Sequence, residues 1–196
     1  MKAHKWMQMG ICLAVLVLVS LACSVKSEAS DGSVQSFDES GLSFAPPKGT
    51  IVMDFLGPSV QAKKTDQSPE GNLLGPICQM GTYDHEGFSQ DKGSQWHMEA
   101  SRLTSNMGLT LGDPTETTLN GEAALVGDIS GTMLAEMDSR GTPISGRVMM
   151  ASIDEKRIFD LTCYGPASRQ AETLELFEAV VGSVKFYEPI VPTAVP

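Results

Sequence analysis

The chain opens with an uncharged apolar run that stops abruptly at a cysteine. Its first five residues include two lysines, residues 10–22 carry no charge, and the residues that follow Cys23 are mostly polar. This run is too short for a permanent transmembrane helix, which needs about 20 apolar residues. A basic start followed by a short apolar run is typical of an export signal. We therefore expect residues 1–22 to be cleaved and the folded part to lie outside the cytoplasm.

The end of this run, "VSLAC", resembles the lipobox of bacterial lipoproteins. In that family the peptide before the cysteine is removed and the thiol carries a diacylglycerol, so the resemblance implies that Cys23 is the lipidated first residue. Ser20 and Leu21 depart from the commonest pattern, which has leucine and a small residue there. The alternative is that Cys23 is a core or disulfide cysteine beside an ordinary cleavage site.

Lipidation implies a membrane-tethered protein in the cell envelope. More than one acyl chain is needed for durable anchoring. In double-membraned bacteria, Ser24 after the cysteine resembles the outer-membrane sorting class. The resemblance therefore implies a domain on the periplasmic side of the outer membrane, with the lipid as its contact to the bilayer.

The remainder divides into three parts. Residues 23–40 are rich in serine and acidic residues and poor in large apolar ones, which predicts a flexible tether. Residues 41–188 are long enough for one domain with one core. The proline-rich residues 189–196 are expected to be disordered.

Charge argues against nucleic acid as a partner. The expected signal removes two of the 14 basic residues and none of the 24 acidic ones, so the formal net charge changes from −10 to −12. Phosphate backbones and anionic head groups repel such a chain. We expect an envelope protein as partner, and the sequence leaves the oligomeric state open.

The hydrophobic pattern predicts an α+β domain. Short apolar stretches predict strands in "GLSFAPP", "TIVMDFL" and "NLLGPICQMGTY". Trp96, Ala100, Leu103 and Met107 then recur at helical spacing, with Ser94 as a candidate N-cap and Gly108 as a stop.

Three further strands and a helix complete the pattern. The strands lie in "ETTLNGEAALVGDISGTML", "TPISGRVMMASI" and "KRIFDLTCY", and Asn120–Gly121 is a strong hairpin signal. The helix lies in "ASRQAETLELFEAVV", with Ser168 as candidate N-cap and Gly182 as stop, before a short strand at Val184–Phe186. The expected architecture is a central antiparallel sheet of about six to seven strands packed by two main helices.

This order of elements, together with "GLSFAPPKGT", "LNGEAALV" and "ETLELFEAVVGSVKF", resembles the PsbP-like superfamily, which includes DcrB- and LpqN-type bacterial lipoproteins. The resemblance implies an α/β/α sandwich and a non-catalytic binding or assembly role, by fold analogy. The tryptophan that usually follows the Pro-x-Gly of the first turn is replaced by Thr50.

Catalytic motifs are missing from the sequence. Outside the expected signal the histidines are His85 and His97, and neither a GxSxG elbow nor a GxxxxGK[ST] phosphate loop occurs. We predict no catalytic residue, no cofactor, and a surface or boundary position for His97.

A metal site is a weaker alternative. Asp84, His85 and Glu86 offer carboxylate and imidazole ligands in a polar loop. Adjacent side chains in an extended segment point in opposite directions, so a solvated acidic loop is the preferred interpretation.

Two cysteines remain in the domain, Cys78 and Cys163. Exported thiols tend to pair, so we favour a buried disulfide between strands over two inert core thiols. The sequence thus predicts an envelope lipoprotein with a binding or assembly domain. A periplasmic binder of a small ligand or metal, and a hydrolase without a recognisable motif, are the alternatives.

Overall fold

The computed structural model describes residues 28–54, 58–61, 75–84, 92–135, 141–153 and 157–190. Residues 1–27, including Cys23, lie outside this part, as do His85, Glu86 and residues 191–196. The helices are the 3₁₀ turns η1 (Asp38–Ser40) and η2 (Ala167–Arg169) and the α-helices α2 (Lys92–Met107) and α3 (Gln170–Val181). The strands are β1 (Glu28–Ala29), β2 (Gln35–Phe37), β3 (Leu42–Phe44), β4 (Ile51–Asp54), β5 (Pro58–Gln61), β6 (Ile77–Asp84), β7 (Leu109–Leu111), β8 (Thr115–Leu119), β9 (Glu122–Thr132), β10 (Pro143–Ser152), β11 (Arg157–Pro166) and β12 (Lys185–Phe186).

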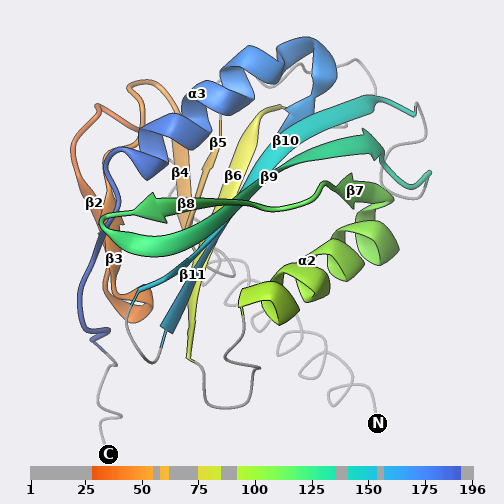
Figure 1. Cartoon of the computed structure of the whole chain (residues 1–196). Helices are drawn as coiled ribbons and strands as arrows, with labels where there is room; N and C mark the ends of the chain where they lie inside the picture. The colour runs from red at the N-terminus through yellow and green to blue at the C-terminus, as the bar shows by residue number, and fades with distance from the viewer. Residues whose placement is uncertain are drawn as a thin grey trace, which may run out of the picture.

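These strands form two antiparallel sheets in the described part of the chain. The main sheet has nine strands in the order β1-β4-β5-β6-β11-β10-β9-β7, with β8 also paired to β9, and the small sheet has the order β12-β3-β2. Helix α3 lies on one face of the main sheet and α2 on the other (Figure 1). The predicted α+β sandwich is confirmed, but the estimate of six to seven strands for the central sheet was too low. Strands β1, β5 and β7 have only two to four residues, too few to show a period of their own.

Apolar side chains of α3 form the core on the first face. Leu176, Phe177 and Val180 are buried there against β6 and β11 residues such as Met80 and Phe159. A charged contact borders this core: the Arg147 guanidinium lies 5.7 Å from the centre of the Phe177 ring and 3.7 Å from Glu178. The helix is therefore held by burial, with an ion pair at its margin.

The second core lies beneath α2. Trp96, Leu103 and Met107 are buried against residues of β10 that include Val148 and Met150. This confirms the predicted helical face. Ser94 is not the N-cap, because α2 already begins at Lys92.

Most of the residues predicted to end helices or to form turns lie where expected. Gly108 follows α2 with φ +73°, and Asn120 and Gly121 have φ +54° and +88°, so the stop and the hairpin are confirmed. Gly182 follows α3 as predicted, in right-handed geometry. The Ser168 cap was wrong, because Ser168 lies inside η2 and α3 begins after it.

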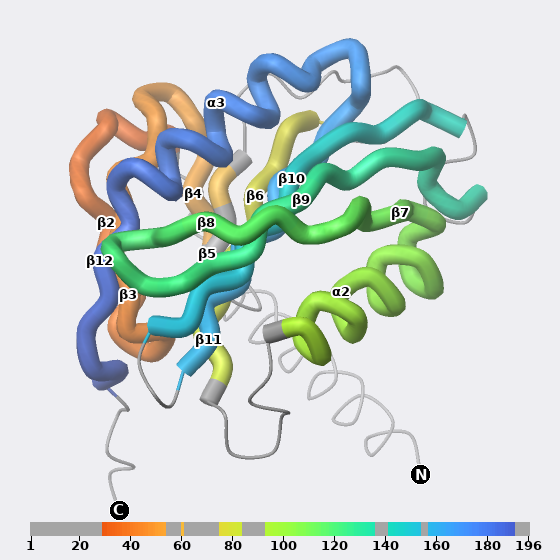
Figure 2. The backbone as a smooth tube through the Cα atoms, viewed as in Figure 1, coloured from red at the N-terminus to blue at the C-terminus, as the bar shows by residue number. Residues whose placement is uncertain are grey.

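The small sheet joins the two ends of the domain. Strand β3 lies between β2, its neighbour in sequence, and β12, which is far along the sequence (Figure 2). Tyr187 donates its hydroxyl hydrogen bond to the Leu42 carbonyl at 2.9 Å, and Arg157 Nη1 donates to the Tyr187 carbonyl at 2.8 Å. The first bond ties Tyr187 to β3, and the second attaches this region to β11.

Both predicted domain limits need correction. The expected tether 23–40 contains β1, β2 and η1, because Phe37 stacks on Phe44 with ring centres 5.5 Å apart and so has a core to enter. At the other end, the backbone N–H of Ile190 donates to Asp38 at 2.9 Å, so order extends two residues beyond 188. Within the described part, none of the helices has the length and apolar character required to cross a bilayer.

Candidate functional site at the interface of α2 and β11

A charged residue lies in the middle of the apolar face of α2. Glu99 is three residues after Trp96 and four before Leu103, so helical geometry turns all three toward the sheet. Glu99 is 6% exposed, although ionisable side chains are rarely buried without partners. Its carboxylate must therefore be satisfied at the interface between helix and sheet.

Two partners satisfy Glu99. Arg102, one turn further along α2, donates through Nε to Oε2 at 2.6 Å and through Nη2 to Oε1 at 2.5 Å. This paired geometry is the strong form of the arginine–carboxylate contact. From the sheet, the hydroxyl of Thr162 on β11 lies 3.2 Å from Glu99 Oε1. Glu99 thus links α2 to β11.

A second carboxyl lies on the other side of Thr162. Asp160 Oδ1 is 3.4 Å from the Thr162 hydroxyl, because residues two apart on a strand point to the same face. Although Asp160 as a residue keeps some contact with solvent, its pKa is raised to about 7. Desolvation is the main cause and the nearby Glu99 adds to it, while Arg102 and the Thr162 hydrogen bond act in the opposite direction. Asp160 is therefore a group that gains and loses a proton near neutral pH.

The interface has an aromatic margin on β6. Tyr83 is 53% exposed, and its hydroxyl lies 3.2 Å from the position that a Cβ on Gly81 would take. Gly81 pairs with Asp160 across the strands. Desolvation raises the pKa of Tyr83, and the charges of Asp160 and Glu99 raise it further. The ring therefore lies beside the carboxyl pair with part of its surface open to solvent.

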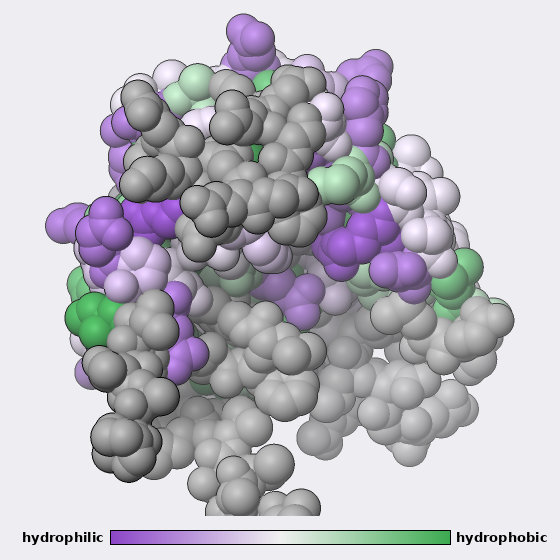
Figure 3. Space-filling model, turned by 90° about the horizontal axis from the view of Figure 1, so that it is seen from below, coloured by the Kyte–Doolittle hydropathy of each residue, from purple (hydrophilic) through white to green (hydrophobic). Residues whose placement is uncertain are grey.

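We call Glu99, Arg102, Asp160 and Thr162 the polar cluster. Its Asp160 carboxyl can take up and release one proton, and its carboxyl, guanidinium and hydroxyl groups can form hydrogen bonds. Within the described part of the chain, no three His, Cys, Asp or Glu residues are arranged to hold a metal ion. The surface seen from below is mostly hydrophilic where it is described, with hydrophobic residues in small separate spots (Figure 3).

The predicted site residues fall in different places. Cys23, His85 and Glu86 lie outside the described residues, and Asp84 ends β6 opposite Arg157, so the metal prediction stays untested. His97 is exposed on α2, as expected for a surface histidine.

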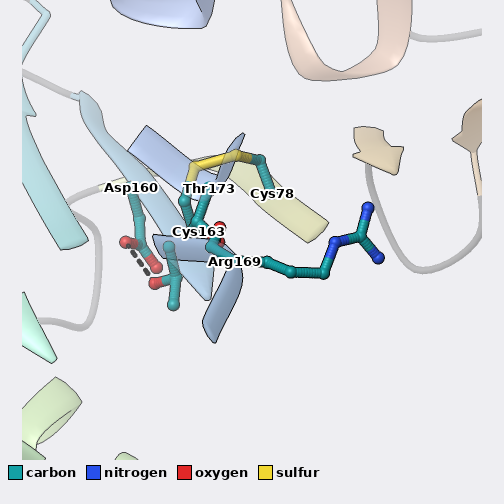
Figure 4. Close-up of a disulfide and its surroundings, with 6 residues drawn as sticks. Cys78, Asp160, Cys163, Arg169 and Thr173 are labelled. Atoms are coloured by element: carbon teal, nitrogen blue, oxygen red, sulfur yellow. Dashed lines mark hydrogen bonds between the residues drawn. A yellow bond between two sulfur atoms is a disulfide. The ribbon is translucent and has the colours of Figure 1, made fainter. Parts of the chain in front are cut away.

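The predicted disulfide between Cys78 and Cys163 is present in the structure (Figure 4). The two cysteines face each other directly on β6 and β11, and both are fully buried. Cys163 and Asp160 are three residues apart on β11, so the disulfide and the carboxyl of Asp160 lie on opposite faces of the sheet.

Sequence reasoning missed the polar cluster. Two signals were available: a glutamate on the apolar face of a helix, and Asp160 and Thr162 in alternation with Phe159, Leu161 and Cys163. Neither signal says that the two segments meet, because they are about 60 residues apart in sequence and only the packing of α2 on the sheet brings them together.

Comparison with known proteins identifies the fold. No family model and no curated protein sequence matches the chain. Among solved structures, LpqN of Mycobacterium tuberculosis, described as involved in cell envelope biogenesis, matches with a TM-score of 0.57 at 10% identity, covering 84% of this chain and 92% of LpqN.

Two further structures agree. The Ran-binding protein Mog1p of Saccharomyces cerevisiae has a TM-score of 0.52 at 10% identity, covering 83% of this chain and 96% of Mog1p. The cyanobacterial PsbP (CyanoP) of Synechocystis sp. PCC 6803 has a TM-score of 0.51 at 11% identity, covering 80% of this chain and 94% of CyanoP. At such low identity these similarities concern the fold, and at that level they confirm the resemblance predicted from the sequence.

Proposed function

We propose that this chain, whose domain has the PsbP-like fold, is a lipoprotein of the cell envelope, anchored through Cys23, whose domain binds or assembles another envelope component without catalysis. The observation that carries the proposal is the Ala22–Cys23 pair at the end of a short uncharged run. It supplies both an export signal and an attachment point for lipid.

The Cys78–Cys163 disulfide supports an exported location. Disulfides persist in oxidising compartments and are rare in the cytosol. This bridge joins two neighbouring strands in the middle of the main sheet. LpqN, which shares the fold, is described as involved in cell envelope biogenesis, and this is consistent with the same compartment.

The start of β1 limits the distance from the proposed anchor to the domain. Residues 24–27 are all that separates Cys23 from Glu28, the first residue of β1. Even when fully extended, such a segment spans only about 17 Å at roughly 3.4 Å per residue. The proposed anchor therefore keeps the domain close to the bilayer, so its partner should also be at or near the membrane.

The anchor is tested by expressing the full chain and analysing the mature protein by mass spectrometry. We expect an amino terminus at Cys23 that carries acyl groups, and sedimentation with membranes. Cys23→Ala should lose acylation, whereas the matched control Cys12→Ala, in the same apolar run, should keep it. An unacylated terminus in the unmodified protein would refute the anchor.

The binding role is tested separately by crosslinking in intact membranes, with identification of the products by mass spectrometry. We expect a defined envelope component linked to the anchored protein and reduced linkage with Cys23→Ala. If the anchored protein gives no crosslink above background, the assembly role is refuted while the anchor stands.

A further inference from the structure

The polar cluster forms a continuous chain of polar contacts from α2 to β11. Arg102 is bonded to Glu99, the Thr162 hydroxyl lies 3.2 Å from Glu99, and Asp160 lies 3.4 Å from the same hydroxyl. The apolar contacts of Trp96, Leu103 and Met107 hold the rest of the helix. The cluster is therefore a polar attachment of α2 to β11.

The Thr162 hydroxyl cannot donate to both carboxyl groups at once. A threonine hydroxyl has one hydrogen to donate, but two carboxyl oxygens approach it. If Asp160 is ionised, one of the two oxygens faces a lone pair of the hydroxyl. If Asp160 is protonated, it donates to Thr162 and Thr162 donates to Glu99, which accepts from Arg102. A proton on Asp160 therefore satisfies every contact, whereas ionised Asp160 competes with Glu99 for the one hydroxyl hydrogen.

Among the described residues around Asp160, no second cation is placed to replace that proton. From α2 it is faced by Glu99 and Arg102, and Arg102 is engaged by Glu99 on two bonds. From β6 the facing ionisable group is Tyr83. On β11 itself the ionisable group on the same face as Asp160 is Tyr164, which is within reach of the Arg102 charge. Met150 of β10, the cross-strand partner, is uncharged. In the described part of the chain, Arg102 is thus the cation that acts on Asp160.

We propose that the polar cluster is a proton-operated clasp, which holds α2 closed on β11 while Asp160 carries a proton and lets the helix open more often when Asp160 is ionised. Opening here means local separation of α2 from the sheet while α3 and the rest of the domain stay folded.

The direction of the pH effect follows from linkage. In the closed form the pKa of Asp160 is about 7, and in the open form the carboxyl is hydrated and returns to about 3.9. The open form therefore binds fewer protons between these two values, so opening becomes more favourable as pH rises from about 4 to about 7 and levels off above. Below about pH 4 the opening constant stays at its lowest value.

Hydrogen exchange measured by mass spectrometry on the full chain in detergent tests the clasp. Peptides from α2 are compared with peptides from α3 at about pH 5 and about pH 7.5. Each exchange rate is divided by the rate expected for the same peptide when unstructured at that pH, which gives the opening constant of the segment. We expect the opening constant of α2 to rise by about tenfold or more between these pH values, with that of α3 unchanged. An α2 opening constant that stays constant, or that rises together with α3, would overturn the proposal.

Two variants separate the clasp from other carboxyls. Asp160→Asn keeps a donor for Thr162 and cannot ionise, so α2 opening should become independent of pH. Asp128→Asn, which removes an exposed carboxyl on β9 paired with Arg147 at 2.9 Å, should keep the pH dependence of the unmodified protein. A pH effect that survives in Asp160→Asn overturns the clasp. If that variant does not fold, the pH series on the unmodified protein decides alone.

Discussion

Trp96 occupies a space that exists because residue 127 is a glycine. The indole is 3% exposed, and its N–H donates to the Gly112 carbonyl at 3.3 Å. A Cβ on Gly127 would lie 2.7 Å from ring atom Cζ2, closer than real Cβ contacts come. The glycine on β9 and the tryptophan on α2 are therefore matched in shape, one from each side of the interface.

We predict that Gly127→Ala destabilises the domain. The added methyl group must displace a buried ring, and overpacking of this kind costs about 1–3 kcal/mol of the free energy of unfolding. Urea unfolding followed by circular dichroism measures the change. The control is Gly112→Ala, whose Cβ would meet the Asp128 carbonyl at an ordinary 3.5 Å. Equal losses in the two variants would contradict the shape argument.

Helix α2 combines two kinds of attachment that respond to different conditions. Its apolar residues Trp96, Leu103 and Met107 are buried at any pH, whereas the polar cluster changes with the proton on Asp160. Helix α3 differs, since its ion pair with Arg147 involves the exposed Glu178. Ion pairs of that kind contribute little, so α3 is the suitable reference when α2 is tested.

The apolar attachment of α2 gives a prediction of its own. Leu103 is fully buried and Met98, on the same helix, is 44% exposed. Leu103→Ala removes core contacts and leaves a cavity, so it should lower the free energy of unfolding by about 2–5 kcal/mol. Met98→Ala should change it by less than about 0.5 kcal/mol. Thermal or urea unfolding of both variants measures the difference, and similar losses would show that α2 is not packed as described.

At the scale of the whole molecule, contacts between distant segments hold the domain together. The disulfide joins residues separated by 85 positions. The small sheet joins β2 and β3 near the start of the domain to β12 near its end. Neither connection is local, so both can form only when segments from most of the described chain have come together.

The disulfide should account for a large share of stability. In the chain-entropy description, a bridge that closes a loop of this length stabilises by up to about 4–5 kcal/mol. We expect the free energy of unfolding to fall by an amount of this order when the protein is reduced. The double variant Cys78→Ser with Cys163→Ser is the control, because reductant should not change it further. In a chain that lacks residues 1–23, and with them Cys12 and Cys23, two reactive thiols after denaturation without reductant would show that the bridge does not form.

The sequence by itself determined the elements whose signal is local. The helical face of Trp96, Leu103 and Met107, the Asn120–Gly121 hairpin and the alternating strand around Leu161 were all predicted. Each of these features depends on residues that are close in sequence, either along one helix or strand or across one hairpin. At that range backbone geometry alone decides which side chains share a face.

The tertiary structure decided everything that depends on distant partners. Strands β1, β2, β5 and β7 are too short to carry a pattern and exist because another strand completes their hydrogen bonds. The disulfide was one of two alternatives until Cys78 and Cys163 proved to be opposite each other. Glu99 and Asp160 are ordinary acidic residues in the sequence. Packing of α2 on β11 brings them together around a single hydroxyl. The desolvation that raises the pKa of Asp160 is a property of that packing rather than of the residue.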